Sequence, residues 1–278
     1  MIQASVKPVG PYSLRLSAWR DVVRAPLPGG GEGIAWQERD RSVVLRAPDE
    51  AGVERLRFML ALRPEDDVTA FVRRFRRDPL IGRAIGAFPG VRPLRLPTMA
   101  HAVLRAFCGQ LIEAKEARRL ERRILRRCGV AAPLREDLAA LAPAELRRLG
   151  LAQSRATCLV RVCRGLDLER LRELPLEAVE QRLLREPGLG PWSLGTIGLE
   201  GLGSYRYPIT RDLSFVKLLS SLEGRWVEPE ETDALFAPYE EWAGLASVYL
   251  LRAWSAGLVP GASADHSRAV RVASRRAA

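Results

Sequence analysis

The residues best suited to do chemistry lie in one stretch of the chain, residues 186–217. Gly188, Leu189 and Gly190 predict a tight turn, and Pro191 suits the first position of a following helix, where its missing N–H would have no helical partner. Two glycines allow a ligand to approach the backbone closely, and free amides at a helix start bind anions, most often phosphate. The stretch therefore predicts a phosphate-binding turn.

A single acidic residue follows this turn about twenty residues later. Asp212 precedes Leu213, Val216 and Leu219, whose spacing predicts one apolar face of a helix. An acid at a helix N-terminus stays ionised, because the free amides and the helix dipole favour its charge. Two interpretations are open: a carboxylate that takes part in chemistry next to the phosphate-binding turn, or a plain N-cap that follows a plain turn.

Together, the Gly-hydrophobic-Gly turn, its spacing and the aspartate resemble the helix-hairpin-helix DNA glycosylase superfamily (HhH-GPD), in particular its DNA-3-methyladenine glycosylase II branch. The resemblance implies a mainly α fold, in which a small N-terminal α+β domain with an antiparallel sheet precedes the helical domains. It also implies that Gly188, Leu189, Gly190 and Ser193 contact DNA. Asp212 would assist the loss of a damaged base from a flipped nucleotide. No cofactor is implied beyond a structural monovalent cation at the hairpin.

The same resemblance suggests the residues of a base pocket. Trp192 stands where the bifunctional members carry a lysine nucleophile, which implies base release without strand cleavage. Trp192 and Trp242 would stack on a cationic alkylated purine, an interaction worth about 1–2 kcal/mol when desolvated. Thr196 replaces a further pocket aromatic, and Trp19 is a candidate contact from the first domain. As alternatives, Trp192 fills the core of the hairpin, and Trp19 belongs to the core or to the sheet.

A second motif lies between two predicted helices. Thr98 begins an apolar helical stripe that ends near Gly109, and a second helix is predicted over residues 113–127. The intervening Gln110-Leu111 turn is similar to the family turn that fills the gap left by the flipped base. Leu111 would be the wedge, since an apolar side chain replaces lost stacking without needing a hydrogen-bond partner. The alternative places Leu111 in the core between the helices.

Composition favours a polyanionic partner. The 278-residue chain has a net charge of +11, with 47% hydrophobic and 28% charged residues, as expected for a globular protein. No apolar run approaches the roughly 20 residues of a membrane span, and the N-terminus lacks a signal-peptide pattern. We expect a cytoplasmic, nucleoid-associated monomer that binds double-stranded DNA and no membrane.

Metal chemistry is not expected. The four cysteines form no C-x2-C pair, and the two histidines are isolated in the sequence, so neither a cluster nor a zinc site is predicted. Buried free thiols are the expected state of the cysteines.

Changes in composition and residue pattern along the chain predict three parts. Residues 1–94 form the α+β domain, with strands expected over 13–17 and 42–46 and a helix over 64–76. A Pro-rich connector near residue 94 leads to the helical glycosylase region, residues 95–260. The remaining residues, 261–278, are small, polar and basic, which is typical of a disordered tail.

These features predict a monofunctional DNA glycosylase for alkylated purines of the 3-methyladenine and 7-methylguanine type, acting in base excision repair. It would flip the damaged nucleotide and hydrolyse its N-glycosidic bond with the help of Asp212. A bifunctional glycosylase-lyase, a glycosylase for another lesion and a non-catalytic DNA-binding protein with the same hairpin remain as alternatives.

Overall fold

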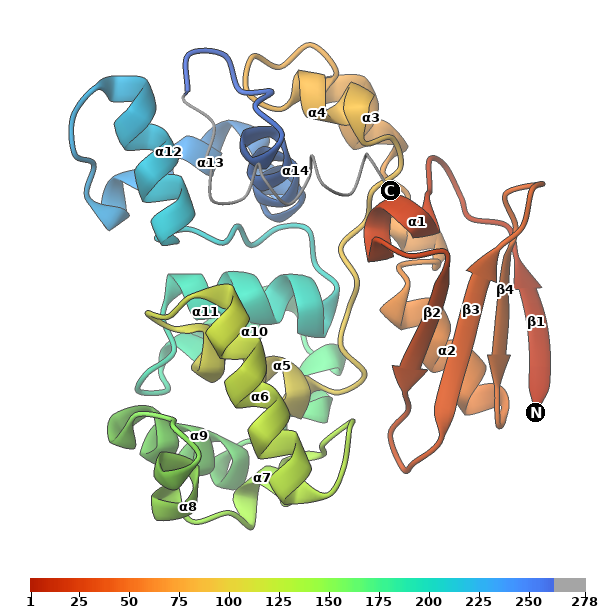
Figure 1. The fold of residues 1–278 in the computed structure, drawn as a ribbon, viewed down its shortest axis with the longest axis vertical. Coiled ribbons are helices and arrows are strands. Elements are labelled where there is room, and N and C mark those ends of the chain that lie inside the picture. Colours follow the sequence, from red (N-terminus) through yellow and green to blue (C-terminus); the bar gives the residue numbers. More distant parts are fainter. Residues whose placement is uncertain (263–278) are drawn as a thin grey trace.

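In a computed structural model, which describes residues 1–262, the chain is mainly helical with one small antiparallel sheet near its N-terminus. Its buried apolar side chains form three separate clusters. One cluster lies under the sheet and two lie among the helices, so that the sheet and the helical part stand beside each other (Figure 1). This arrangement confirms the expected fold class.

The N-terminal sheet has the strand order β1-β4-β3-β2, and every neighbouring pair is antiparallel. In β3, Gly33 and Ala35 are buried two residues apart, as the period of two in a strand requires, whereas in the central strand β4 every residue but Arg46 is buried. The expected strand over 42–46 is confirmed as β4. The elements are β1 (Ile2–Val6), β2 (Val22–Pro26), β3 (Glu32–Gln37), β4 (Val43–Ala47) and α2 (Glu50–Met59).

Two local expectations in this region were wrong. Residues 13–17 do not form a strand but begin the short helix α1 (Leu14–Ala18), capped by the Ser13 hydroxyl, which accepts from the amide of Leu16 at 3.2 Å. The expected helix over 64–76 is broken into a 3-10 turn (Pro64–Asp66) and α3 (Thr69–Phe75). It breaks because the Asp67 carboxylate accepts from the amide of Thr69 at 2.9 Å, which starts a new helix there.

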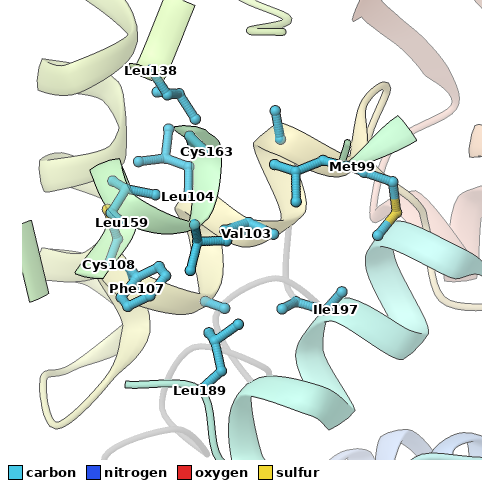
Figure 2. Close-up of a cluster of buried hydrophobic side chains, with 14 of the residues drawn as sticks. Met99, Val103, Leu104, Phe107, Cys108, Leu138, Leu159, Cys163, Leu189 and Ile197 are labelled. Atoms are coloured by element: carbon cyan, nitrogen blue, oxygen red, sulfur yellow. The ribbon is translucent and has the colours of Figure 1, made fainter. Parts of the chain in front are cut away.

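The first helical core surrounds α5, whose side chains are almost all buried. Figure 2 shows Val103 of α5 at the centre of this cluster, with Leu159 of α9 on one side and Ile197 of α11 on the other. Central burial on all sides makes α5 the support of both predicted DNA-contacting turns. The helices are α5 (Met99–Gly109), α6 (Ala114–Cys128), α7 (Arg135–Ala139), α8 (Pro143–Arg148), α9 (Gln153–Gly165), α10 (Leu176–Leu184) and α11 (Pro191–Ile197), with a 3-10 turn (Glu169–Glu173) before α10 and a π-helical turn (Gly198–Leu202) after α11.

The second helical core joins distant parts of the chain. Phe71, Phe75 and Ile85 of α3 and α4 pack with Phe215 and Tyr249 from the C-terminal helices, and Figure 1 shows α3 and α4 beside α14. We expected the domain boundary near residue 94, but the packing assigns residues 68–91 to this core. The helices are α4 (Gly82–Ala87), α12 (Leu213–Glu223), α13 (Thr232–Phe236) and α14 (Ala243–Ser255), with 3-10 turns at Pro229–Glu231 and Ala237–Trp242.

The Pro-rich connector is a packed junction. Arg92 is fully buried and donates to the carbonyl oxygens of Ala61 at 2.8 Å and Pro11 at 3.0 Å. Arg95, also buried, pairs with Asp66 and donates to the carbonyl oxygen of Gly203 at 3.0 Å. Buried guanidinium groups must be hydrogen-bonded, so these contacts hold the sheet and the helices together.

Across residues 1–262, no helix combines the length and the apolar character needed to cross a membrane. The predicted disordered tail, residues 261–278, lies almost entirely outside the described residues, which end at residue 262.

Candidate active site

The Asp212 carboxylate is held at both oxygens. As the N-cap of α12 it accepts a hydrogen bond at Oδ1 from the amide of Ser214 at 2.8 Å, which confirms the predicted capping role. Its Oδ2 accepts from the indole Nε1 of Trp192 at 2.9 Å. The preceding Arg211 does not neutralise it, because that guanidinium binds Asp233 at 2.8 Å. The Asp212 carboxylate is therefore fixed in one orientation, and Arg211 does not form an ion pair with it.

Trp192 is wedged between α5 and Asp212. A methyl group on Gly109, the last residue of α5, would lie 2.6 Å from Cη2 of the indole, well inside van der Waals contact. On the side of α11, the buried Thr196 hydroxyl donates to the carbonyl oxygen of Trp192 at 3.2 Å. Gly109 thus leaves room for the ring, and the ring in turn orients the carboxylate. The sequence reasoning gave Gly109 no role.

A second glycine brings the Asp212 segment close to α11. A methyl group on Gly195 would lie 2.2 Å from the carbonyl oxygen of Pro208 and 3.0 Å from Cα of Ile209. The backbone of the segment that ends at Asp212 therefore lies directly against α11. Sequence reasoning also missed Gly195, since its neighbour is thirteen residues away in the chain.

The predicted hairpin lies between α10 and α11. Gly188 is exposed with φ +85°, a conformation that favours glycine, and Gly190 is the N-cap of α11 with no side chain to accept from the first helical amides. Pro191 takes the first helical position, as predicted. Leu189 turns inward and is only 6% exposed, so its side chain anchors the turn in the first helical core and leaves its backbone at the surface.

The turn between α5 and α6 presents an isolated apolar side chain. Leu111 is 98% exposed with φ +57°, so the alternative that places it in the core is wrong. The neighbouring Gln110 side chain, in contrast, is bonded to the hairpin. Its Nε2 donates to the carbonyl oxygen of Gly188 at 2.6 Å and to the hydroxyl of the buried Ser193 at 3.0 Å. Arg155 of α9 donates to the carbonyl oxygen of Gln110 at 2.6 Å. These bonds join the Leu111 turn to the hairpin.

A buried polar network fixes the two helices that carry the Leu111 turn. Arg105 of α5 donates to the Glu121 carboxylate of α6 at 2.9 and 3.1 Å and pairs with Glu200 of the π-helical turn. His101 approaches the same Glu121 at 2.8 Å. Burial opposes ionisation of Glu121, but hydrogen bonds from His101 and Arg105 prevail and hold its pKa below the usual value. The network sets the angle between α5 and α6.

The exposed face of α6 is basic. Lys115, Arg119, Arg122 and Arg126 recur at i, i+4, i+7 and i+11, which places them on one exposed stripe that begins directly after the Leu111 turn. Only Arg119 of these four forms an ion pair with another described residue, Glu116. The stripe places unpaired positive charge beside the turn.

The other two predicted aromatics lie away from this pair: Trp242 packs against the second helical core, and Trp19 is at the surface. Trp242 stacks on Tyr205, with ring centres 5.9 Å apart, and is tilted against Phe71 at 5.8 Å. Trp19 is 50% exposed, with Arg252 over its ring at 4.6 Å. Trp19 thus contacts Arg252 of α14. Neither Trp19 nor Trp242 has a recorded contact with Trp192 or Asp212, which contact each other.

The cysteines are unpaired, as expected, with Cys108 and Cys163 buried and Cys128 and Cys158 half-buried. Burial raises the pKa of Cys163 to about 12 and that of Cys128 to about 11, which leaves the thiols protonated. Within residues 1–262 no group of three or more histidine, cysteine or acidic side chains is arranged to hold a metal ion.

No protein-family model matches the chain, but the chain is similar to individual known proteins. A DNA-3-methyladenine glycosylase from Bacillus subtilis (strain 168) is 23% identical over 208 residues, which are 68% of this chain and 68% of that protein.

Two solved structures share the arrangement of the elements. The 3-methyladenine DNA glycosylase from Archaeoglobus fulgidus superposes with a TM-score of 0.76 at 20% identity, over 91% of this chain and 98% of that chain. An 8-oxoguanine glycosylase/lyase from Clostridium acetobutylicum, bound to double-stranded DNA with cytosine opposite 8-oxoguanine, superposes with a TM-score of 0.68 at 17% identity, over 86% and 90% of the two chains. At these identities the likeness establishes the fold.

Proposed function

We propose that this chain, which has the fold of the helix-hairpin-helix DNA glycosylases, is a monofunctional DNA glycosylase that releases alkylated purines from duplex DNA in base excision repair. The observation that carries the proposal is the bond from Trp192 Nε1 to Asp212 Oδ2 at 2.9 Å. It places an aromatic ring, rather than a lysine amine, directly against the carboxylate.

The role of Asp212 follows from charge. When the C1′–N bond of a flipped nucleotide breaks, its electron pair moves to the base and the sugar becomes cationic. An alkylated purine already carries positive charge, so it leaves as a neutral base and needs little acid assistance. A carboxylate held by Ser214 and Trp192 opposes the sugar charge without having to reorganise. Water then bonds to C1′, and its proton passes to the carboxylate or to solvent.

DNA would be held by the hairpin and the Leu111 turn. The exposed Gly188, the half-buried Gly190 and the free amides at the start of α11 suit a backbone phosphate. An apolar side chain that is 98% exposed in a left-handed backbone conformation is unfavourable for a protein alone. Insertion of Leu111 between bases would explain both features. Gln110 and the buried Ser193 would act by fixing this turn to the hairpin.

The preference for alkylated purines rests on the aromatic residues. The indole of Trp192 offers a face to a cationic base, an attraction worth about 2 kcal/mol when desolvated. Thr196, which bonds to the carbonyl oxygen of Trp192, would support this wall of the pocket, whereas Trp242 and Trp19 contact other side chains. The Bacillus and Archaeoglobus relatives, which are named for 3-methyladenine, support this choice.

The positions of the lysines support base release without strand cleavage. A lyase needs an amine that attacks C1′ of the sugar to form a Schiff base. The chain has only three lysines, Lys7, Lys115 and Lys217, and Lys217 is exposed on α12 past Asp212. The residue that contacts Asp212 is therefore Trp192 and not a lysine, which argues against lyase chemistry.

A monovalent cation at the hairpin fits the donors present. The carbonyl oxygens of Glu186 and Gly190 each accept one backbone hydrogen bond and keep a lone pair that could bind such an ion. The ion would help to hold a phosphate there, with no part in bond cleavage.

The test is base release from methylated duplex DNA by wild type and by Asp212→Asn, read on gels before and after alkali. Asparagine caps helices as well as aspartate does, so the variant should fold and bind DNA. We expect its rate of release to fall at least about 100-fold, as for loss of a preorganised electrostatic group. Asp49→Asn is the matched control, because Asp49 also caps a helix, α2 beside the sheet, where its carboxylate accepts from the amide of Gly52 at 2.7 Å.

Each outcome is informative. Methylpurine release by wild type and Asp49→Asn, with strand breaks appearing only after alkali, supports the proposal. Breaks without alkali would move the chain to the lyase class. Release by Asp212→Asn at the wild-type rate would refute the carboxylate mechanism. Tight DNA binding without release of any base would leave a non-catalytic DNA-binding protein.

A further inference from the structure

One exposed face of α12 begins beside Asp212 and leads away from it. Leu213, Lys217, Ser220 and Gly224 recur at i, i+4, i+7 and i+11, so they lie on one side of the helix. Leu213 is 58% exposed, and just past the helix end Trp226 is 61% exposed. Two large apolar side chains thus mark the ends of a face that otherwise carries small residues and one lysine.

The far end of this face is hollowed. Gly224 ends the helix with φ +67°, and a methyl group on it would meet no atom within 4 Å, so it keeps the hollow open. The shallow hollow has a volume of about 490 Å³. It is lined by Lys217, Ser220, Ser221, Gly224, Arg225 and Trp226.

The charges at the hollow leave one cation for a ligand. Arg225 is bound by Glu223 at 2.7 Å and Glu231 at 2.5 Å, and it donates to the carbonyl oxygen of Trp226 at 3.0 Å, which fixes the loop. Lys217, in contrast, forms no ion pair with any residue of the described part, 1–262. An exposed indole beside an unpaired ammonium suits a ligand that offers both an apolar surface and an anionic group.

We propose that this face of α12 is a second DNA contact, in which Lys217 binds a backbone phosphate and Trp226 packs on a deoxyribose of the duplex that flanks the flipped nucleotide. The inference rests on the proposed function, because that function places DNA at Asp212, next to Leu213. Eleven residues separate Leu213 from Gly224, so the face extends about 16 Å, which corresponds to about five base pairs. Every deoxyribose presents the same apolar surface, so this contact would not depend on the base sequence.

The test measures the affinity of the full chain for duplexes that carry a stable abasic-site analogue, by fluorescence anisotropy. One duplex has about ten base pairs on both sides of the analogue, and two others are cut to about two pairs on one side or the other, shorter than the reach of α12. The variants are Trp226→Ala and Lys217→Gln. Trp36→Ala and Lys7→Gln change the same residue types in the N-terminal sheet domain and serve as controls.

We expect Trp226→Ala to weaken binding of the long duplex about 5- to 100-fold, the range for loss of one large apolar side chain buried against a sugar. The loss should largely vanish on one of the two shortened duplexes and persist on the other. Lys217→Gln should lower the slope of log Kd against log salt concentration by about 1, as for one phosphate contact. The two control variants should bind every duplex like wild type.

Equal affinities of wild type, Trp226→Ala and Lys217→Gln on every duplex would overturn the inference, whether or not methylpurines are released. If wild type then self-associates and Trp226→Ala does not, the face belongs to a second copy of the chain. Because the readout is binding, failure of base release with the length-dependent loss intact would refute the proposed catalysis and keep the DNA contact. Trp226 is mostly exposed, so thermal unfolding should match wild type and exclude misfolding.

Discussion

Gly109→Ala should break the contact between Trp192 and the Asp212 carboxylate, although neither of these two residues is substituted. The new methyl group would lie 2.6 Å from Cη2 of Trp192 and 3.4 Å from Cζ2. Carbon atoms pack at about 3.5–4.0 Å, so the indole must move by about 1 Å. Its Nε1 now lies 2.9 Å from Asp212 Oδ2, and such a shift breaks the bond or displaces the carboxylate.

The expected effect is larger on the rate than on stability. Overpacking a core site costs about 1–3 kcal/mol in the free energy of unfolding. A misplacement of about 1 Å at reacting groups can lower a rate about 100-fold. We therefore expect the single-turnover rate of methylpurine release to fall about 100-fold, while the thermal unfolding midpoint falls by a few degrees.

The matched control is Gly86→Ala in α4. Gly86 is also helical, but a methyl group there meets no atom within 4 Å, so the variant should keep the wild-type rate and be slightly more stable. The readouts are stopped-time base release and thermal unfolding by circular dichroism. A wild-type rate for folded Gly109→Ala would refute the idea that the position of Trp192 sets that of Asp212.

Three further predictions follow from the same geometry. Gly195→Ala puts a methyl group 2.2 Å from the carbonyl oxygen of Pro208, a backbone clash that should destabilise the fold by about 3 kcal/mol in urea unfolding, and an unchanged midpoint would contradict it. Leu111→Ala should weaken binding to an abasic-site analogue by roughly 1–3 kcal/mol without changing thermal stability, and equal affinity would argue against insertion. Burial raises the pKa of the Cys163 thiol to about 12, so at pH 8 its thiolate fraction should be about one in ten thousand. Cys163 should therefore resist alkylation, detected by mass spectrometry, until the protein unfolds, and fast labelling of folded protein would refute this.

Local sequence signals were sufficient for several parts of this protein. The Gly-Leu-Gly-Pro turn, the helix that Asp212 caps, the helix that Thr98 caps and strand β4 all formed where they were predicted. Each depends on backbone preferences or caps within a few residues, such as proline at a first helical position or a side-chain oxygen that accepts from a nearby amide.

Predictions failed where short local patterns had two solutions. Residues 13–17 alternate like a strand, but Leu14 and Ser17 are also three apart, and tertiary packing buried those two in a helix. Packing likewise joined residues 68–91 to α12–α14 rather than to the sheet, because Phe71 and Phe75 found their aromatic partners in Tyr239 and Tyr249.

By itself, the sequence determined the identities of the chemical groups: a basic chain, a glycine turn, one acid at a helix start, and an aromatic residue where a lysine nucleophile would otherwise stand. Only the tertiary structure decided what these groups touch. It brought Gly109 of α5 and Asp212 of α12 to opposite sides of the Trp192 indole, and it left Leu111 exposed while binding Gln110 to the hairpin. The physical reason is that these contacts join residues 20 to 83 positions apart, and no local preference of the backbone encodes a distance across packed helices.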